Sequence, residues 1–440
     1  MQVSIETTSG LERRLTVGVP AERVDSEVNQ RLQKAAKTIR LDGFRPGKVP
    51  MNVVRQRFGP GVRQEVIGEV MSQSFYEAVS QENLKPAGQP SIEPKNLEEG
   101  KDIEFIATFE VFPDVELVDL AGLKVDRPKA EVNDDDIATM IETFRKQQGS
   151  YEVVGRAAAL EDQVNIDYQG TRDGEAFEGG SAEGSDLVLG SGRMIAGFED
   201  GIVGMTAGEE KTLSLSFPED YHNEDLKGAA VEFKIKLNTV QEMALAELND
   251  EFFEKFGVTE GGEESFREEI GKNMQRELKN AIKARVKQQV MDGVVEAHEG
   301  LEIPAALLDQ EISVMRKQMF QQFGGAGAAP DLDLDSLLPA DMFSEEANKR
   351  VKLGLVLNEF ISKESLKADA DKVRETIEEM AATYQDPEEV INHYYGNQEQ
   401  LSAIESMVLE DQIVEKILES ADVSDSECSY QEALEQSRQA

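Results

Sequence analysis

The chain has 440 residues, of which 39% are hydrophobic and 30% charged, and its formal net charge at pH 7 is −41. This length is too great for one hydrophobic core and predicts about three domains. No apolar run approaches the roughly 20 residues that span a bilayer, and no secretory signal is visible at the amino terminus. Cys428 is the one cysteine, so a disulfide scaffold is excluded and a cytoplasmic protein is expected.

The first 112 residues predict a small α+β domain. Apolar residues at 3–5 and 15–19 flank Ser9-Gly10, which is the pattern of a hairpin. A helix should begin at Pro20, because apolar residues then recur at helical spacing as far as Ile39.

Further elements are expected after a loop at 43–50. A short helix should occupy 51–58 and end at Gly59-Pro60, because proline breaks the helical hydrogen-bond ladder. A longer helix should follow over 62–79, and alternating apolar residues at 103–112 predict the last strand of the domain.

The loop Gly43-Phe44-Arg45-Pro46-Gly47-Lys48-Val49-Pro50 must form an exposed turn, because its glycines and prolines cannot continue a helix. It presents Phe44, Arg45 and Lys48, and the two cations suit phosphate or carboxylate groups. The surrounding segment 23–63 holds ten basic and three acidic side chains, a net charge of +7. We interpret it as a polyanion site; the alternative is a solvated turn whose Phe44 packs on its own domain.

Residues 113–150 predict a connector. Asn133-Asp134-Asp135-Asp136 is typical of a helix start. The apolar face of this helix would consist of Ile137, Met140, Ile141 and Phe144. Because a flexible spacer would not keep such a face, we expect the connector to pack on the carboxy-terminal domain.

Residues 151–243 differ in composition, with short strands, many glycines and aromatic residues between them. The predicted elements are a strand at 164–170, a turn at Asp173-Gly174, a short helix within 194–202, and strands at 213–217 and 231–237.

From residue 244 to residue 440 the pattern predicts helices. Between Phe266 and Val290 an apolar residue recurs at every fourth position, and such a repeat drifts around a helix. This long helix should therefore meet different neighbours along its length. Further helices are predicted over 304–323, 344–360, 369–384, from 386 onward and over 401–418. We expect a flexible tip at 324–330 and a disordered polar tail after 418.

The sequence shows no metal-binding pattern. His222, His298 and His393 are far apart and lack zinc-ligand spacing, so no metal site is expected. Adjacent carboxylates such as Glu268-Glu269 are interpreted as solvated helix faces rather than as acid/base pairs.

The Gly-Phe-Arg-x-Gly-Lys-x-Pro stretch at 43–50 resembles the ribosome-docking signature of the trigger factor family, and the order of elements fits this family over essentially all 440 residues. The resemblance implies a ribosome-binding domain at 1–112 and an elongated all-α chaperone domain at 244–440, whose arms cradle nascent and unfolded chains. It implies no membrane partner, and a homodimer when the protein is free. The residues that it assigns to the rim protein and rRNA at the exit tunnel are Gly43, Phe44, Arg45, Pro46, Gly47 and Lys48.

Residues 151–243 resemble the FK506-binding-protein type of prolyl isomerase. The resemblance rests on V-x-I-D-Y-x-G from Val164, D-G-x-x-F-E from Asp173 and I-x-G-F-E-x-G from Ile195. It implies an antiparallel sheet wrapped on a short helix, with an apolar catalytic pocket that needs no cofactor. Taken singly, such aromatics are more often ordinary core. The pocket residues carried over by position are Tyr168, Phe177, Glu178, Leu187, Met194, Ile195, Phe198, Tyr221 and Phe233.

Three hypotheses of different classes follow for this multidomain α+β chain. The first is a ribosome-associated chaperone that keeps new chains open, assists their folding and export, and isomerises prolyl bonds. The second is a free cytoplasmic prolyl isomerase whose helical arms deliver its substrates. The third is an RNA-binding protein that uses residues 23–63; it is the weakest, because regularly placed aromatics on a sheet are absent from that segment.

Overall fold

The computed structural model describes residues 2–39, 41, 44, 48–98, 100–221, 223, 226–322, 337–382, 384 and 386–438. The chain divides into two compact units. Unit 1 comprises Met1–Arg127 and Val286–Ser424, and unit 2 comprises Pro128–Arg285 and Asp425–Ala440. Within the described residues, no helix is long and apolar enough to cross a membrane. The architecture is multidomain α+β, as predicted.

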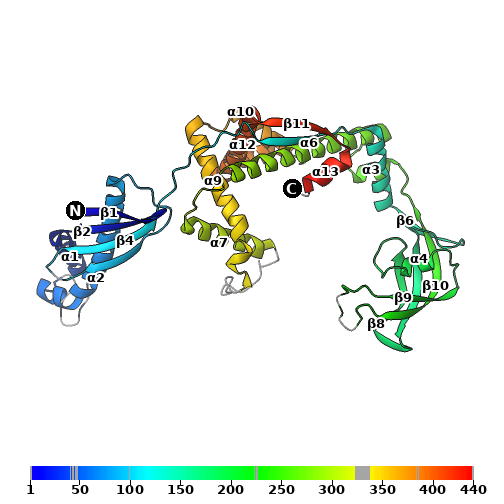
Figure 1. Cartoon of the computed structure of the whole chain (residues 1–440), viewed down its shortest axis with the longest axis horizontal. Helices are drawn as coiled ribbons and strands as arrows, with labels where there is room; N and C mark the ends of the chain where they lie inside the picture. Colours follow the sequence, from blue (N-terminus) through cyan, green and yellow to red (C-terminus); the bar gives the residue numbers. More distant parts are fainter. Residues whose placement is uncertain are drawn as a thin grey trace. The chain divides into compact units, whose positions relative to one another are not determined.

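The amino-terminal part of unit 1 is an antiparallel sheet in the order β1-β2-β4-β3, with two helices beside it (Figure 1). Leu15 and Phe105 from the sheet and Phe75 from the second helix are fully buried in one shared core. The strands are β1 (Gln2–Ser9), β2 (Glu12–Val19), β3 (Ser91–Asn96) and β4 (Ile103–Glu110); the helices are α1 (Ala21–Ala36) and α2 (Met51–Gln81).

The prediction of two helices separated at Gly59-Pro60 is wrong, because α2 continues through Pro60. An internal proline costs roughly 3 kcal/mol. Apolar packing on both sides offsets this cost: Val54 lies in one buried cluster, Val66 in another, and Val62 packs against both. Strand β3 was not predicted because it is polar and contains Pro94, which an edge strand tolerates.

Unit 2 contains a five-stranded antiparallel sheet in the order β6-β10-β7-β8, with β9 paired to β10. The predicted turn between β7 and β8 is present, and Asp173 and Gly174 have φ values of 52° and 87° there. Helix α4 lies beside this sheet (Figure 1), and its Phe198 and Ile202 are fully buried in the sheet's core. The elements are β6 (Ser150–Val154), β7 (Gln163–Arg172), β8 (Glu175–Val188), α4 (Phe198–Ile202), β9 (Glu210–Ser216) and β10 (Ala230–Ala244).

A helical core completes unit 2. Asn133 starts α3 (Asp134–Gln147) with the predicted cap, since its side chain accepts hydrogen bonds from the N–H groups of Asp135 and Asp136. This helix packs with α5 (Asp250–Lys255) and with the first half of α6 (Gly262–Ala297), where Phe266 is buried.

Helix α6 meets different neighbours along its length, as its drifting repeat predicted. Its early residues Phe266 and Met274 lie in the core of unit 2. Later, within unit 1, Lys287 Nζ lies 2.8 Å from a carboxylate oxygen of Glu410 and 3.3 Å from one of Asp411.

The other helices that the structure describes in unit 1 follow the predicted order, and a short 3₁₀ turn that was not predicted lies among them. They are α7 (Ala305–Gln322), the 3₁₀ turn η2 (Ala340–Met342), α9 (Ser344–Glu364), α10 (Ala370–Ala381), α11 (Pro387–Gly396) and α12 (Gln398–Leu418). The predicted flexible tip at 324–330 lies outside the described residues.

The polar tail is ordered, contrary to the predicted disorder. Strand β11 (Asp422–Glu427) pairs with β5 (Lys124–Lys129), and α13 (Tyr430–Arg438) follows. Tyr430 and Ala433 are buried in the same core as Phe266. These few apolar contacts, spaced three residues apart in a polar segment, are enough to anchor it.

Candidate functional site

A cavity of about 500 Å³ opens on the isomerase-like sheet of unit 2. Its wall is largely aromatic and aliphatic, with Glu178, Arg193 and Asn223 as polar members. The full lining is Tyr168, Phe177, Glu178, Gly179, Gly180, Arg193, Met194, Ile195, Ala196, Phe217, Pro218, Tyr221, Asn223, Leu226 and Phe233.

Phe233 on β10 is the centre of the aromatic cluster beneath the cavity. Its ring lies 6.1 Å from that of Tyr168, 6.0 Å from that of Phe177 and 5.3 Å from that of Phe198, measured between centroids. The last two pairs meet edge to face, at interplanar angles of 90° and 86°. Such contacts fix ring orientations and favour a rigid wall.

Two glycines allow Phe177 to enter this cluster. A Cβ atom on Gly170 would come within 2.7 Å of the Phe177 ring, and one on Gly180 within 2.6 Å. Any other residue at these positions would push the ring out of place.

The structure brings together all the sequence-predicted pocket residues except Leu187 and Phe198 in the lining of the cavity. Leu187 is buried in the core behind it, with 6% of its surface exposed. Phe198 is fully buried below the lining and presents its ring to Tyr168 at 5.6 Å. The catalytic role of these residues remains a prediction.

Sequence reasoning missed other lining residues, above all Phe217 and Leu226. The ring of Phe217 lies 4.6 Å from that of Tyr221 and 5.9 Å from that of Phe177. Leu226 belongs to the connection that follows β9, where no periodic pattern marks an inward side chain. Phe217 directly follows β9 and continues the alternation of Leu213 and Leu215, which pack against the same core. This alternation is the signal that could have indicated this wall.

The segment 190–194, on one side of the cavity, is held by a single carboxylate. Glu199 on α4 accepts hydrogen bonds from the N–H groups of Gly190 at 2.8 Å and Arg193 at 3.0 Å. Burial of the carboxyl group disfavours its charge, but the hydrogen bonds from this segment outweigh burial, and the pKa of Glu199 is lowered.

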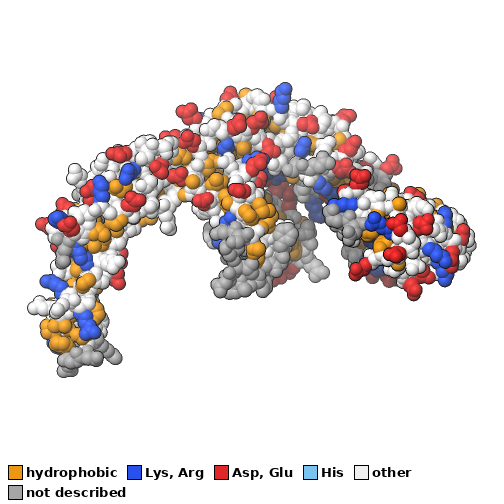
Figure 2. Space-filling model, turned by 60° about the horizontal axis from the view of Figure 1, so that its bottom comes forward, with side chains coloured by type: hydrophobic (Ala, Val, Ile, Leu, Met, Phe, Trp, Pro, Cys, Tyr) orange, Lys and Arg blue, Asp and Glu red, His pale blue; other side chains and the backbone are white. Residues whose placement is uncertain are grey.

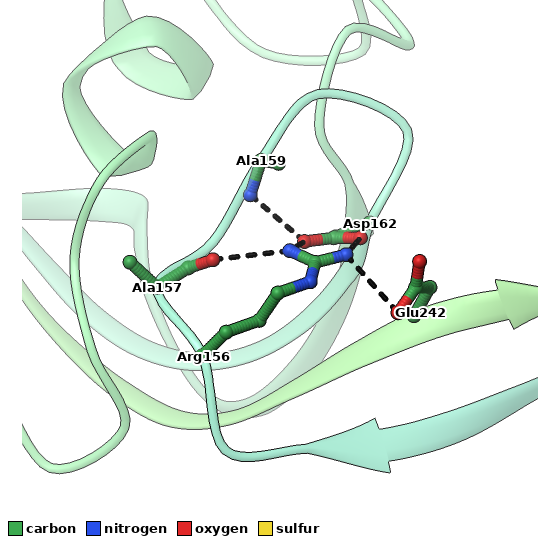
Figure 3. Close-up of polar contacts among 5 residues, drawn as sticks. All are labelled: Arg156, Ala157, Ala159, Asp162 and Glu242. Atoms are coloured by element: carbon green, nitrogen blue, oxygen red, sulfur yellow. Dashed lines mark hydrogen bonds and ion pairs between the residues drawn. The ribbon is translucent and has the colours of Figure 1, made fainter.

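A second buried carboxylate, Asp162, fastens the connection between β6 and β7 (Figure 3). Arg156 donates to its two oxygens at 2.6 and 2.8 Å, and the N–H of Ala159 donates at 2.8 Å. Arg156 also lies 3.4 Å from Glu242 on β10. Burial of Asp162 opposes ionisation, yet the hydrogen bonds from Arg156 and Ala159 prevail, and its pKa is lowered.

The predicted docking loop is described only in part. Phe44 exposes 39% of its surface and its N–H donates to the carbonyl of Leu41, while Lys48 is exposed. This exposure argues against the alternative in which Phe44 packs on its own domain. Gly43, Arg45, Pro46 and Gly47 lie outside the described residues.

Acidic residues of α2 neutralise part of the basic segment around this loop. Arg23 forms an ion pair with Glu77 at 2.7 Å, and Arg31 forms one with Glu69. Glu69 and Glu77 lie outside residues 23–63, so they were not included in the net charge of +7. Figure 2 shows basic side chains interspersed with acidic ones on the visible face of the molecule.

Five described cations of the segment form no ion pair within the described part of the chain: Lys34, Lys37, Lys48, Arg55 and Arg57. Arg55 donates to the side-chain oxygen of Asn29 at 2.7 Å, and the other four remain available. The positive surface is thus smaller than the sequence suggested, and it lies on the segment that carries the loop.

Three regions match known families. Residues 1–144 match the family described as bacterial trigger factor protein, residues 264–419 match its C-terminus, and residues 155–238 match FKBP-type peptidyl-prolyl cis-trans isomerase. Curated proteins named trigger factor are similar over the full length. The one from Cellvibrio japonicus is 56% identical over 439 residues and that from Alcanivorax borkumensis 56% identical over 440 residues, with 100% of both chains covered in each comparison. The one from Pseudomonas aeruginosa strain LESB58 is 54% identical over 434 residues, with 99% of this chain and 98% of the relative covered.

Proposed function

The chain belongs to the trigger factor family and is a ribosome-associated chaperone with an FKBP-type prolyl isomerase domain, and from this premise we propose how its parts divide the work. The loop 43–50 docks the protein on the rim of the ribosomal exit tunnel, in the cytoplasm. The helical region at 244–440 holds nascent and unfolded chains, and the domain at 151–243 isomerises their prolyl bonds. The observation that carries the proposal is the aromatic cavity on the sheet of unit 2.

The cavity suits rotation about a prolyl amide. Resonance gives this rotation a barrier of about 18–20 kcal/mol and makes X–Pro isomerisation slow. In the twisted transition state the nitrogen is less conjugated and the amide less polar than in the planar ground state. A wall made of Tyr168, Phe177 and Phe233 removes water from the amide, and it therefore favours the twisted form over the planar one. No nucleophile takes part in this reaction.

The docking assignment is supported by the exposure of Phe44 and Lys48. An exposed aromatic ring next to cations can insert into or stack on a partner, while the cations contact phosphate or carboxylate groups. Acidic residues dominate elsewhere, since the whole chain carries −41. Repulsion from a polyanion then leaves this loop as the favoured point of contact.

Replacing lining residues tests the isomerase assignment. Ile195→Ala and Tyr221→Ala should each lower kcat/KM for a proline-containing peptide by about tenfold or more, because each removes apolar contact with the twisted amide. Leu160→Ala is the matched control, since Leu160 is an exposed apolar residue of the same domain and does not line the cavity. Protease-coupled peptide isomerisation gives the rates.

The same variants separate the chaperone from a free isomerase with delivery arms. Prevention of aggregation of an unfolded protein without prolines should remain at the level of the unmodified protein, because holding belongs to the helical region. Loss of both activities in folded Ile195→Ala would contradict this division of work. Unchanged isomerisation in both cavity variants would contradict the assignment of the cavity.

A further inference from the structure

The carboxylate of Glu199 is satisfied entirely by the segment that precedes it in the chain. One oxygen accepts from the N–H groups of Gly190 at 2.8 Å and Gly192 at 3.2 Å. The other accepts from the N–H groups of Arg193 at 3.0 Å and Met194 at 3.2 Å, and from the hydroxyl of Ser191 at 3.3 Å. The residue is 8% exposed, so these bonds are largely shielded from water.

This segment leads directly into the cavity wall. Arg193, Met194 and Ile195 line the cavity. The backbone N–H groups of Arg193 and Met194 donate hydrogen bonds to Glu199. At the base of the segment, the N–H of Leu189 donates to the carbonyl of Asp162 at 2.9 Å. Backbone bonds therefore fix the base. In the tip, the N–H of Ser191 donates to the carbonyl of Val188 at 3.2 Å, and the other described hydrogen bonds of residues 190–194 go to Glu199.

The position of Glu199 in α4 couples the tip to the floor below the cavity. The preceding residue, Phe198, is fully buried and packs its ring against Tyr168 and Phe233. Gly197, with φ of 85°, precedes the helix. Phe198 and Glu199 then point in different directions, because successive side chains of a helix are about 100° apart. The short helix thus presents a ring to the aromatic cluster and a carboxylate to the segment.

We infer that Glu199 is a positioning residue of the isomerase site: its buried carboxylate holds the backbone of residues 190–194 and thereby keeps Met194 and Ile195 in the cavity wall. The inference rests on the proposed function of the cavity. In this role Glu199 does not contact the substrate. It acts through the residues whose N–H groups donate hydrogen bonds to its carboxylate.

The chemistry explains why a carboxylate is needed. A carboxylate only accepts hydrogen bonds, and it has two oxygens for the donors of this segment. In Glu199→Gln one oxygen becomes an NH₂ group that faces N–H donors, so several bonds are lost. Glu199→Asp keeps the charge but is one methylene shorter, and should restore part of the contact.

The experiment compares the full-length protein with Glu199→Gln, Glu199→Asp and the control Asp162→Asn. Asp162 is also a buried carboxylate with several donors, but its side chain contacts Arg156 and Ala159, which do not line the cavity. The backbone bonds at Leu189 are kept in all variants. Two quantities are measured at a temperature at which all four proteins are folded: hydrogen exchange of the amides of 190, 192, 193 and 194 by NMR, and kcat and KM for a proline peptide.

We expect Glu199→Gln to speed exchange of these four amides at least tenfold and to lower kcat/KM about tenfold, mainly through a higher KM because the wall is looser. Glu199→Asp should lie between it and the unmodified protein. Asp162→Asn destabilises the whole domain, so it should speed exchange of the amides of β7 and β10 as much as that of the four amides, whereas Glu199→Gln should speed the four amides selectively. Asp162→Asn should change kcat/KM by no more than twofold, because Arg156 and Ala159 do not line the cavity. Faster exchange with unchanged kcat/KM would overturn the inference while leaving the isomerase site in place. Unchanged exchange in Glu199→Gln would overturn it as well, and an inactive unmodified protein would overturn the site itself. If Glu199→Gln does not fold, the inference is tested with Glu199→Asp, by the exchange rates of the same four amides and by kcat/KM.

Discussion

Asp162 illustrates how one residue can stabilise a domain that owes most of its stability to apolar packing. It is 3% exposed and accepts hydrogen bonds from both terminal nitrogens of Arg156 (Figure 3). A buried carboxylate is costly unless its lone pairs are used, and here they are used on both oxygens.

Asp162→Asn should destabilise the isomerase domain at pH 7 by about 1–3 kcal/mol, because an amide cannot accept from both nitrogens of Arg156. Local unfolding measured by hydrogen exchange of β7 and β10 reports the loss. Glu175→Gln, at an exposed position of the same sheet, is the control and should change little.

The difference in stability between the unmodified protein and Asp162→Asn should depend on pH. The pKa of Asp162 is lowered in the folded protein, so its carboxylate stabilises the fold fully above the unfolded pKa of about 3.9. That contribution is lost as pH falls through the lower folded value. The stability difference between the unmodified protein and Asp162→Asn should therefore be constant from pH 6 to 8 and shrink on acidification; a difference that grew in acid would contradict this account.

Single residues of the cavity were predictable where a motif fixes their place. Tyr168, Phe177 and Ile195 stand in three short motifs and all line the cavity. Leu226 could not be found in this way, because its inward orientation depends on how the connection after β9 folds over the sheet. Phe217 stands in no motif, although it continues the alternation of Leu213 and Leu215. Phe198 belongs to a motif, but its depth below the lining is a property of packing.

At the scale of elements, prediction failed where packing outweighs local preference. Pro60 and Gly59 favour a break, yet α2 continues. Val54 before them and Val66 after them lie in two different buried clusters, and Val62 packs against both. The tail after 418 is polar, yet β11 pairs with β5 from a distant part of the sequence. Local patterns do not contain these long-range partners.

Helix α13 provides the test of that tail. Tyr430 is buried, and its hydroxyl donates to a carboxylate oxygen of Glu277 on α6 at 2.8 Å. Burial and this carboxylate raise the pKa of Tyr430, so its hydroxyl stays protonated as the donor.

Tyr430→Ala should cost about 3 kcal/mol through the cavity it leaves, and Tyr430→Phe about 1 kcal/mol through the lost hydrogen bond. Hydrogen exchange of α13 and of the first half of α6 measures both effects. Gln431→Ala, at an exposed neighbouring position, is the control. Equal exchange rates in all of these proteins would mean that the tail does not contribute to stability, which is the result expected of a disordered segment.

At the scale of the whole molecule, charge separates the proposed docking segment from the rest. The chain carries −41, while Lys34, Lys37, Lys48 and Arg57 form no ion pair in the described part of the chain. The sequence predicted the location of this positive segment, but overestimated its charge, because the acids of α2 that pair with Arg23 and Arg31 lie beyond it. Contacts with phosphate through these cations should weaken as salt concentration rises.

The most direct measurement is co-sedimentation with ribosomes at low and high salt. It compares the unmodified protein, the variant Phe44→Ala/Arg45→Ala/Lys48→Ala, and the control Lys95→Ala/Lys101→Ala. The control removes two positive charges from the same domain at residues that form ion pairs with Glu104 and Glu98. Circular dichroism establishes that all are folded. We expect the unmodified protein and the control to pellet with ribosomes at low salt, and the loop variant to stay in solution. Equal pelleting of all three proteins, or of none, would contradict the docking role of the loop.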